Sequence, residues 1–120
     1  MILKDNFFTI NSQEITDKKA DFRIKLNAEN FVYQVHFPNN PITPGVFLIQ
    51  IVTELFGLLK GRKLNIKTLK TVKFTAPINP FEFPEVDFSL DFLEKENLYY
   101  VKAVIKKDET VFAKISIVLV

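Results

Sequence analysis

Apolar and polar residues alternate along several stretches of the chain, as they do in β-strands that bury one face and expose the other. The clearest stretch is residues 86–92, in which every second residue is apolar. The charged tetrapeptide 107–110 lies between two apolar-rich runs and predicts a hairpin turn. The other predicted strands are residues 7–12, 21–26, 30–35, 72–75, 98–106 and 111–120. The pattern therefore favours an antiparallel sheet.

One segment, residues 44–60, has the pattern of a helix instead. Thr43 and Pro44 form a start signal, an N-cap residue followed by proline at the first helical position, and Gly61 is a typical C-terminal stop. Nearly all of the segment is Val, Ile, Leu or Phe, so the helix is apolar over most of its circumference. Its polar members recur at three- and four-residue spacing and form one narrow stripe: Gln50, Thr53, Glu54 and Gly57.

Such a helix cannot lie on a sheet with its back to water, because too much apolar surface would stay exposed. The economical arrangement is an α+β fold in which one curved antiparallel sheet wraps round the single long helix. A second subunit would close the remaining apolar flank. The length of 120 residues suits one domain, and no repeat or linker divides it. We therefore expect a single domain over residues 1–120 that works as a dimer.

Composition narrows the classes of function. Aliphatic and aromatic residues make up 48% of the chain and charged residues 25%, which excludes a disordered or collagen-like protein. The net charge of +2 is too small to indicate a nucleic-acid-binding protein. The chain has no cysteine, and His36 is its only histidine. Disulfides, a cysteine nucleophile and a zinc site are thus disfavoured, and we expect no metal.

The amino-terminal residues lack the pattern of a secretory signal, because Asp5 interrupts them and no sustained apolar run follows. The longest apolar stretch, residues 46–59, is broken by polar residues and is shorter than the roughly 20 residues of a membrane span. Together with the absence of cysteine, these features predict a cytoplasmic protein without a membrane span.

The candidate chemistry lies in residues 35–46, between a predicted strand and the long helix. Three prolines make this segment a stiff connector that holds His36 near the helix start. The first turn of a helix has unpaired N–H groups and a partial positive charge, which suit a developing oxyanion, and a neutral imidazole nearby can remove a proton. A strand-end histidine satisfied by ordinary hydrogen bonds explains the same residues. The residues alone therefore indicate no more than a candidate proton-transfer site.

The order His36-Phe37-Pro38-x-x-Pro41-x-x-Pro44-Gly45-Val46, which opens a long apolar helix, resembles the signature of the hot-dog-fold β-hydroxyacyl-acyl-carrier-protein dehydratases of bacterial fatty-acid synthesis. Residues 25–31 are similar to the strand and turn that lead to the family's histidine. Residues 72–80 are similar to a later strand, although Phe81-Glu82 replaces the Gly-Asp that follows it in the family. The helix-in-sheet architecture expected from the pattern agrees with this resemblance.

The resemblance implies roles for individual residues. His36 matches the catalytic histidine, which takes the α-proton of a (3R)-3-hydroxyacyl thioester, and Gly45 matches the glycine whose N–H binds the thioester carbonyl. The family's second catalytic residue is a helix carboxylate from the other subunit, which assists departure of the hydroxyl as water. Gln50 stands in its position here, and an amide cannot supply a proton at neutral pH.

Three interpretations of this replacement remain. In the first, Glu54 is the acid from one turn further along the helix, about 6 Å away, and Gln50 is a positioning group. In the second, the partner in a heterodimer supplies the acid. In the third, the site binds acyl thioesters or performs other chemistry such as thioester hydrolysis, which hot-dog relatives also catalyse.

Further contacts are expected around this site. Phe37, Pro44, Val46 and Phe47 are expected to contact the substrate, with core packing as the alternative explanation of each. A basic run follows the helix, and Arg62, Lys63 and Lys67 within it are expected to attract an acidic acyl carrier protein that presents the substrate on phosphopantetheine. A solvated loop and strand edge explain the same basic run.

The sequence therefore predicts a 3-hydroxyacyl-acyl-carrier-protein dehydratase-like protein, which forms a trans-2-enoyl thioester and needs no cofactor of its own. It would work as a homodimer or as a heterodimer with another hot-dog subunit. The alternatives are a non-catalytic or partner-dependent subunit that binds acyl thioesters, and a hot-dog thioesterase.

Overall fold

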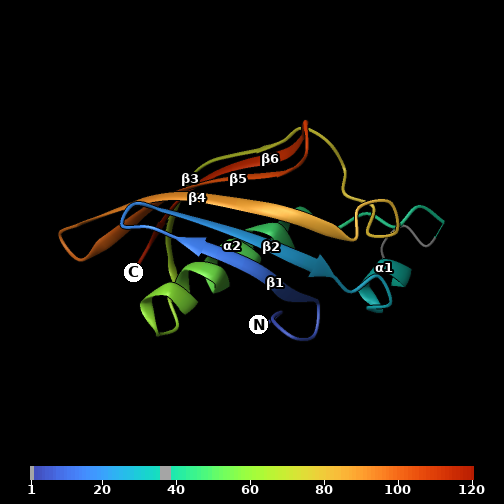
Figure 1. Cartoon of the computed structure of the whole chain (residues 1–120), viewed down its shortest axis with the longest axis horizontal. Helices are drawn as coiled ribbons and strands as arrows, with labels where there is room; N and C mark the ends of the chain where they lie inside the picture. Colours follow the sequence, from blue (N-terminus) through green and yellow to red (C-terminus); the bar gives the residue numbers. More distant parts are fainter. Residues whose placement is uncertain (1, 36–38) are drawn as a thin grey trace.

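The computed structural model describes residues 2–35 and 39–120, in which six strands form one sheet and two helices accompany it (Figure 1). The helices are α1 (Val32–Val35) and α2 (Gly45–Lys60). The strands are β1 (Phe8–Ile15), β2 (Lys19–Leu26), β3 (Ile66–Phe74), β4 (Glu85–Lys95), β5 (Leu98–Lys107) and β6 (Thr110–Leu119). Their order across the sheet is β1-β2-β4-β5-β6-β3, and each neighbouring pair is antiparallel.

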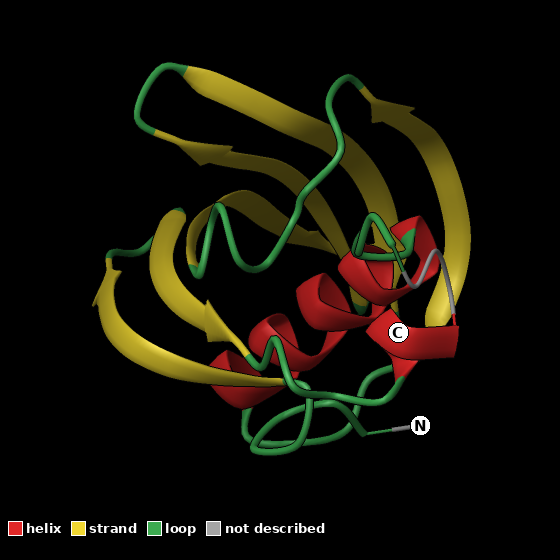
Figure 2. Cartoon of the chain, turned by 90° about the vertical axis from the view of Figure 1, so that its right-hand side faces the viewer, coloured by secondary structure: helices red, strands yellow, loops and turns green. Residues whose placement is uncertain are grey.

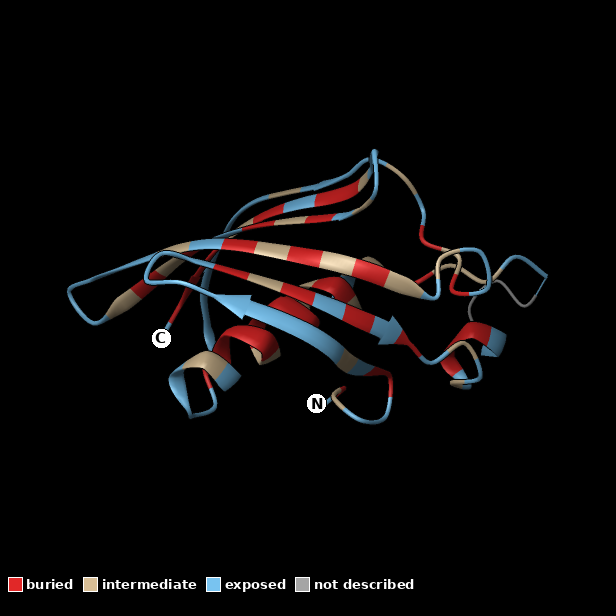
Figure 3. Ribbon diagram, viewed as in Figure 1, coloured by how far each residue is buried: buried red, intermediate tan, exposed pale blue. Residues whose placement is uncertain are grey.

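The sheet curves round α2, which lies in its concave side (Figure 2). Ile51, Leu55 and Phe56 of the helix are completely buried, and the buried residues of the central strands alternate with more exposed ones, as Figure 3 shows for β4. Burial of one large apolar side chain contributes roughly 1.5–3 kcal/mol, so this helix–sheet interface is the main source of stability. The α+β architecture predicted from the pattern is confirmed.

The two ends of α2 differ from each other. Gly61 closes the carboxyl end in the left-handed conformation, with φ 70°, as expected. At the amino end the N-cap is Pro44, and no side chain caps the first turn. Thr43, the expected N-cap, lies one residue before the observed cap. Its hydroxyl donates to the carbonyl oxygen of Ile78 (3.1 Å) and not to the helix. The prediction of a threonine cap is therefore wrong.

The strand predicted at residues 30–35 is also wrong, because these residues turn into the short helix α1. The backbone N–H of Asn30 donates to the carbonyl of Asn27 (3.0 Å), and the Asn30 side-chain oxygen accepts from the N–H of Val32 (3.0 Å). Such local bonds cap a helix and compete with the ladder of a sheet. The other predicted strands are present, although β3 begins at Ile66, well before residue 72.

We expect Gly61→Ala to lower the free energy of unfolding by about 1 kcal/mol, because a side chain is strained at this positive φ. Denaturant unfolding followed by circular dichroism measures the change. Lys63→Ala, at an exposed position in the same turn, is the matched control and should change stability by less than about 0.5 kcal/mol. Equal losses in the two variants would contradict this explanation of the helix stop.

Candidate active site at the start of the central helix

The amino end of α2 offers hydrogen-bond donors. No side chain caps the first turn, although the N–H of Phe47 donates to the carbonyl of Pro44 (3.0 Å). The start of a helix offers donors and the partial positive charge of the helix dipole. The ring of Phe74, at the end of β3, lies directly against Gly45: a β-carbon on this glycine would be 2.4 Å from the ring. A larger residue at position 45 would displace this ring, so Phe74, which is 53% exposed, flanks the predicted oxyanion donor.

His36 and Phe37, the predicted base and one predicted substrate contact, lie outside the described residues. A buried chain of hydrogen bonds joins residues on either side of them. The hydroxyl of Thr43 donates to the Ile78 carbonyl, so the Tyr33 hydroxyl, 2.9 Å from Thr43 Oγ1, is the donor in that contact. Tyr33 also stacks on Phe7, with 5.3 Å between ring centroids. These contacts hold the end of α1 against the residue that precedes Pro44.

Burial raises the pKa of Tyr33 from 10.0 to about 12, and the hydrogen bond to Thr43 opposes this effect only in part. Between these two values the unfolded chain loses the proton and the folded chain keeps it, so stability must fall as pH rises. The loss should reach about 2 kcal/mol at pH 12.

We expect Tyr33→Phe to remove this alkaline loss, because phenylalanine has no proton to release. Urea unfolding at a series of pH values from 9 to 12 measures it. Thr43→Val is the control: it deletes the hydrogen bond but keeps the tyrosine, and the decline of stability with pH should remain. A decline of the same size in Tyr33→Phe would show that another group causes it.

Glu54, the tentative acid, is occupied by the amino-terminal segment. Its carboxylate oxygens accept from the N–H of Leu3 (3.0 and 2.8 Å), and Oε1 also accepts from the N–H of Lys4 (2.8 Å). The amide nitrogen of Gln50 donates to Oε2 (2.8 Å). All of these partners are donors, which suits a carboxylate that only accepts. The geometry therefore favours Glu54 as an anchor over Glu54 as a proton donor.

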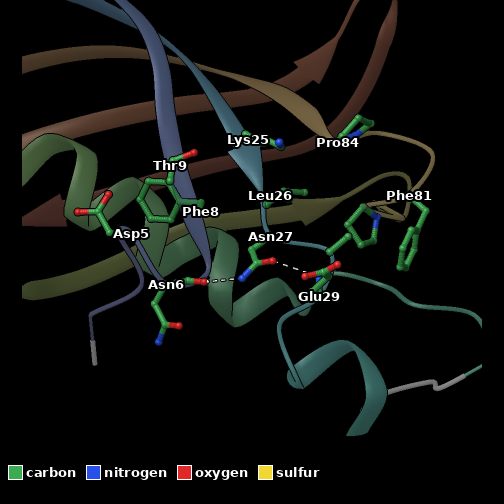
Figure 4. A pocket seen from close by; sticks show the side chains of 12 residues that line it. Asp5, Asn6, Phe8, Thr9, Lys25, Leu26, Asn27, Glu29, Phe81 and Pro84 are labelled. Carbon is green, nitrogen blue, oxygen red and sulfur yellow. Dashed lines mark hydrogen bonds between the residues drawn. The ribbon is translucent and has the colours of Figure 1, made fainter.

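The anchored segment is a tight hook. The carbonyl of Leu3 accepts from the N–H groups of Asn6 and Phe7 (3.1 and 2.7 Å). Asp5, which lies between Leu3 and Asn6 in the chain, has φ 68°. At the far end of the hook, Asn27 donates through its side chain to the carbonyl of Asn6 (3.0 Å), as Figure 4 shows. A cavity of about 570 Å³ lies beside this bond, and among the described residues none of the predicted site residues lines it.

We expect Glu54→Gln to release this hook, because the amide that replaces one carboxylate oxygen is a donor facing donors. The amide protons of Leu3 and Lys4 should lose protection from hydrogen exchange, and the free energy of unfolding should fall by about 1–3 kcal/mol. Glu94→Gln, on an exposed part of β4, is the matched control. Unchanged protection of both amides would contradict the anchoring.

A second cavity, of about 710 Å³, lies along the open flank of α2. Gln50 and Glu54 line it, as do two of the three predicted carrier-binding residues, Arg62 and Lys63. The third, Lys67, is exposed on β3 and is not among the lining residues. The structure thus places the amide of Gln50, the carboxylate of Glu54 and the basic residues after α2 around one cavity.

Gly45 does not share this hollow with Glu54 of its own chain. The nine helical positions between them correspond to about 14 Å along the axis and about half a turn around it. Of the predicted substrate contacts, Val46 is 61% exposed, whereas Phe47 packs edge-on against Phe7, 4.7 Å between centroids, beside the core. One chain therefore presents two separate half-sites: the helix start, and the cavity that contains Gln50.

Sequence reasoning missed the hook, Phe74 and the bond from Tyr33 to Thr43. No sequence signal marks the hook, since Glu54 binds backbone N–H groups that every residue carries. A further contact closes the end of α2: the ammonium group of Lys60 lies 5.2–5.5 Å from the ring centroids of Phe56, Phe92 and Tyr99, a cation–π arrangement over the core.

Within residues 2–35 and 39–120, no group of three His, Cys, Asp or Glu side chains is arranged to hold a metal ion. In the same part of the chain, no helix has both the length and the apolar character needed to cross a membrane.

Comparison with known families identifies the group to which this site belongs. The ApeI-like family, described as ApeI dehydratase, matches residues 12–115, which run from β1 to β6 and include the segment before α2. The chain belongs to the ApeI-like dehydratase family. The resemblance found in the sequence, to hot-dog dehydratases, is thereby confirmed.

Curated relatives agree with this placement of the ApeI-like chain. It is 30% identical to the 3-hydroxyacyl-acyl-carrier-protein dehydratase FabZ of Petrotoga mobilis, with 98% of the chain and 85% of the relative covered. It is 28% identical to the FabZ of Latilactobacillus sakei, with 90% and 79% covered. Both are named as dehydratases, so a dehydratase-like function is supported at this level.

Solved structures show the same fold. The dehydratase heterocomplex ApeI:P from Xenorhabdus doucetiae superposes with a TM-score of 0.72 at 20% identity, covering 92% of this chain and 95% of the other. The (R)-hydratase from A. caviae involved in PHA biosynthesis gives 0.60 at 15% identity, covering 90% and 98%. The predicted hot-dog fold of this ApeI-like protein is confirmed.

Proposed function

We propose that this ApeI-like protein is a 3-hydroxyacyl thioester dehydratase whose active site is shared between two chains. His36 removes the α-proton, the N–H of Gly45 stabilises the enolate oxygen of the thioester, and the hydroxyl leaves from the neighbouring carbon as water. The observation that carries the proposal is the uncapped start of α2 at Gly45, directly after the connector that contains His36.

The two half-sites of one chain meet when a second hot-dog chain pairs along β3. Phe74, at one end of β3, contacts Gly45, and Ile66, at the other end, lines the cavity with Gln50. Antiparallel pairing with the same edge strand of a second hot-dog chain sets the first end of one strand beside the last end of the other. The helix start of each chain then faces the Gln50 side of its partner, which completes both sites.

The proposed reaction also needs a general acid that protonates the leaving hydroxyl. Gln50 cannot donate a proton at neutral pH, and Glu54 is engaged with Leu3 and Lys4. We therefore favour a partner chain that supplies the carboxylate, as in the second interpretation of the sequence. The heterocomplex formed by the structural relative ApeI:P supports this arrangement. A non-catalytic subunit that binds acyl thioesters is the second candidate, and the same residue, Gln50, favours it.

The substrate is proposed to arrive on an acyl carrier protein. Arg62 and Lys63 line the Gln50 cavity, where positive charge would attract an acidic carrier or the phosphate of its phosphopantetheine arm. Lys67, the third residue predicted to bind the carrier, lies on β3, the strand that the second chain would cover, so it is not assigned to this surface. The names of the FabZ relatives specify substrates bound to an acyl carrier protein, which agrees with this proposal.

The test is hydration of a trans-2-enoyl thioester, the reverse reaction, at a protein concentration where sedimentation shows paired chains. We expect Gln50→Glu to raise the rate by on the order of 10²-fold, since a general acid typically contributes 10²–10⁴-fold. The new carboxyl would lie against Glu54, 2.8 Å away in the present contact, and two carboxylates that close cannot both be ionised. One of them would thus retain a proton to transfer.

Gln50→Ala is the control that removes the amide without adding an acid, and it should not raise the rate. His36→Ala combined with Gln50→Glu should return the rate to background. If that double variant stays active, His36 is not the base. If the product is a free thiol and no 3-hydroxyacyl thioester forms, the protein is a thioesterase and the proposal fails.

A further inference from the structure

The outer edge strand β3 has an unusual charge. It carries lysines at positions 67, 70 and 73, and its nine residues include no carboxylate. Its neighbour β6 and the next strand β5 also lack Asp and Glu, and β6 places Lys114 directly opposite Lys73. Lys70 leans across the sheet, with its ammonium 5.4 Å from the ring centroid of Tyr100. No acidic side chain of these strands compensates the edge.

The same strand exposes apolar side chains. Ile66, Leu69 and Phe74 are 42%, 47% and 53% exposed. The opposite edge, β1, exposes one large apolar side chain, Ile15, along a strand that is otherwise largely polar. Since burial of apolar area drives association, β3 is the edge that gains more from being covered.

The local geometry of β3 works against unselective pairing. The register with β6 shifts between Ile66 and Thr68 and again between Leu69 and Thr71, so bulges fall at Lys67 and Lys70. Lysines and bulges on an edge strand are the features by which proteins prevent unwanted strand addition. An apolar edge strand that carries lysines and bulges should pair only with a strand that neutralises the positive charge of the lysines.

A second copy of the chain does not compensate them. In antiparallel pairing centred on Lys70, this lysine faces its own counterpart, and Lys67 of each copy faces Lys73 of the other. A register displaced by one residue still leaves each lysine next to a lysine of the second copy. Like charges directly opposite each other destabilise a pair of strands, whereas opposite charges stabilise it.

We infer that β3 docks a different chain of the same fold, one whose edge strand carries carboxylates opposite Lys67, Lys70 and Lys73, in preference to a second copy of this chain. The inference rests on the two-chain site proposed above and specifies the chemistry of the partner. It assigns Lys67 to the partner strand, so that Arg62 and Lys63 remain for the carrier protein. The paired strand covers Ile66, Leu69 and Phe74.

Charge reversal tests the inference with this protein alone. A triple variant, Lys67→Glu, Lys70→Glu and Lys73→Glu, supplies an acidic β3 edge on the same fold, and it is mixed with wild type at equal concentrations. Sedimentation velocity compares association in the mixture with that of each protein alone. We expect the mixture to associate at least about tenfold more tightly than wild type does with itself, because three facing pairs change from repulsion to attraction. This advantage should shrink in 1 M salt, where charges are screened within about 3 Å.

Two further variants make the result decisive. Replacement of the same three lysines by serine should let the chain pair with itself more tightly than wild type. Reversal of Lys95, Lys102 and Lys106, which lie on β4 and β5 away from the edge, makes the same change in net charge and should give no such gain with wild type. The inference is overturned if the mixture is no tighter than wild type alone, if the control reversal gives an equal gain, or if the assemblies grow beyond two chains.

Association and catalysis are read separately. A mixture that pairs tightly but hydrates no enoyl thioester would contradict the proposed function and leave the partner chemistry standing. A wild-type chain that hydrates the thioester as a tight homodimer, unaffected by charge at β3, would support the function and overturn the inference.

Discussion

The need to bury a helix that is apolar on almost every side governs this structure. A single sheet can cover only the part of α2 that faces its concave surface, and there Ile51, Leu55 and Phe56 are sealed from water. Val46 and Leu58, on the open flank, stay 61% and 49% exposed. The half-sites at the two ends of the helix lie beside this flank. The constraint that stabilises the domain therefore also agrees with the proposal of an active site shared between two chains.

The carboxylate of Glu54 has a structural role on α2 in addition to its place in the polar stripe. It lies one turn from Gln50 along the helix, and it satisfies two backbone N–H groups of the amino-terminal hook. It also holds the amide nitrogen of Gln50, which fixes the orientation of that side chain. The polar stripe thus anchors the amino-terminal hook through Glu54.

Much of the fold followed from periodicity, because residues 86–92 and the helix segment each carry one unmistakable spacing. The error at residues 30–35 has a local cause, since Asn30 uses its side chain to cap a helix turn that alternation cannot reveal. Only part of the candidate site could be predicted from the sequence. Gly45 and its helix were located by a motif, whereas the contact with Phe74 joins residues 29 positions apart and depends on tertiary packing. The hook on Glu54 uses main-chain donors, which leave no trace in the choice of residues.

The position of the amino-terminal hook has a practical consequence for anyone who prepares this protein. Ile2 and Lys4 line the same hollow as Gln50, so the first residues of the chain emerge at the flank where a partner would sit. Extra residues fused at that end, such as an affinity tag, would compete for this space and would change the measured assembly. Val120, at the other end, forms a two-way backbone pair with Asn65 at the margin of the sheet, also close to β3. Removal of such tags is accordingly a condition for measuring how these chains assemble.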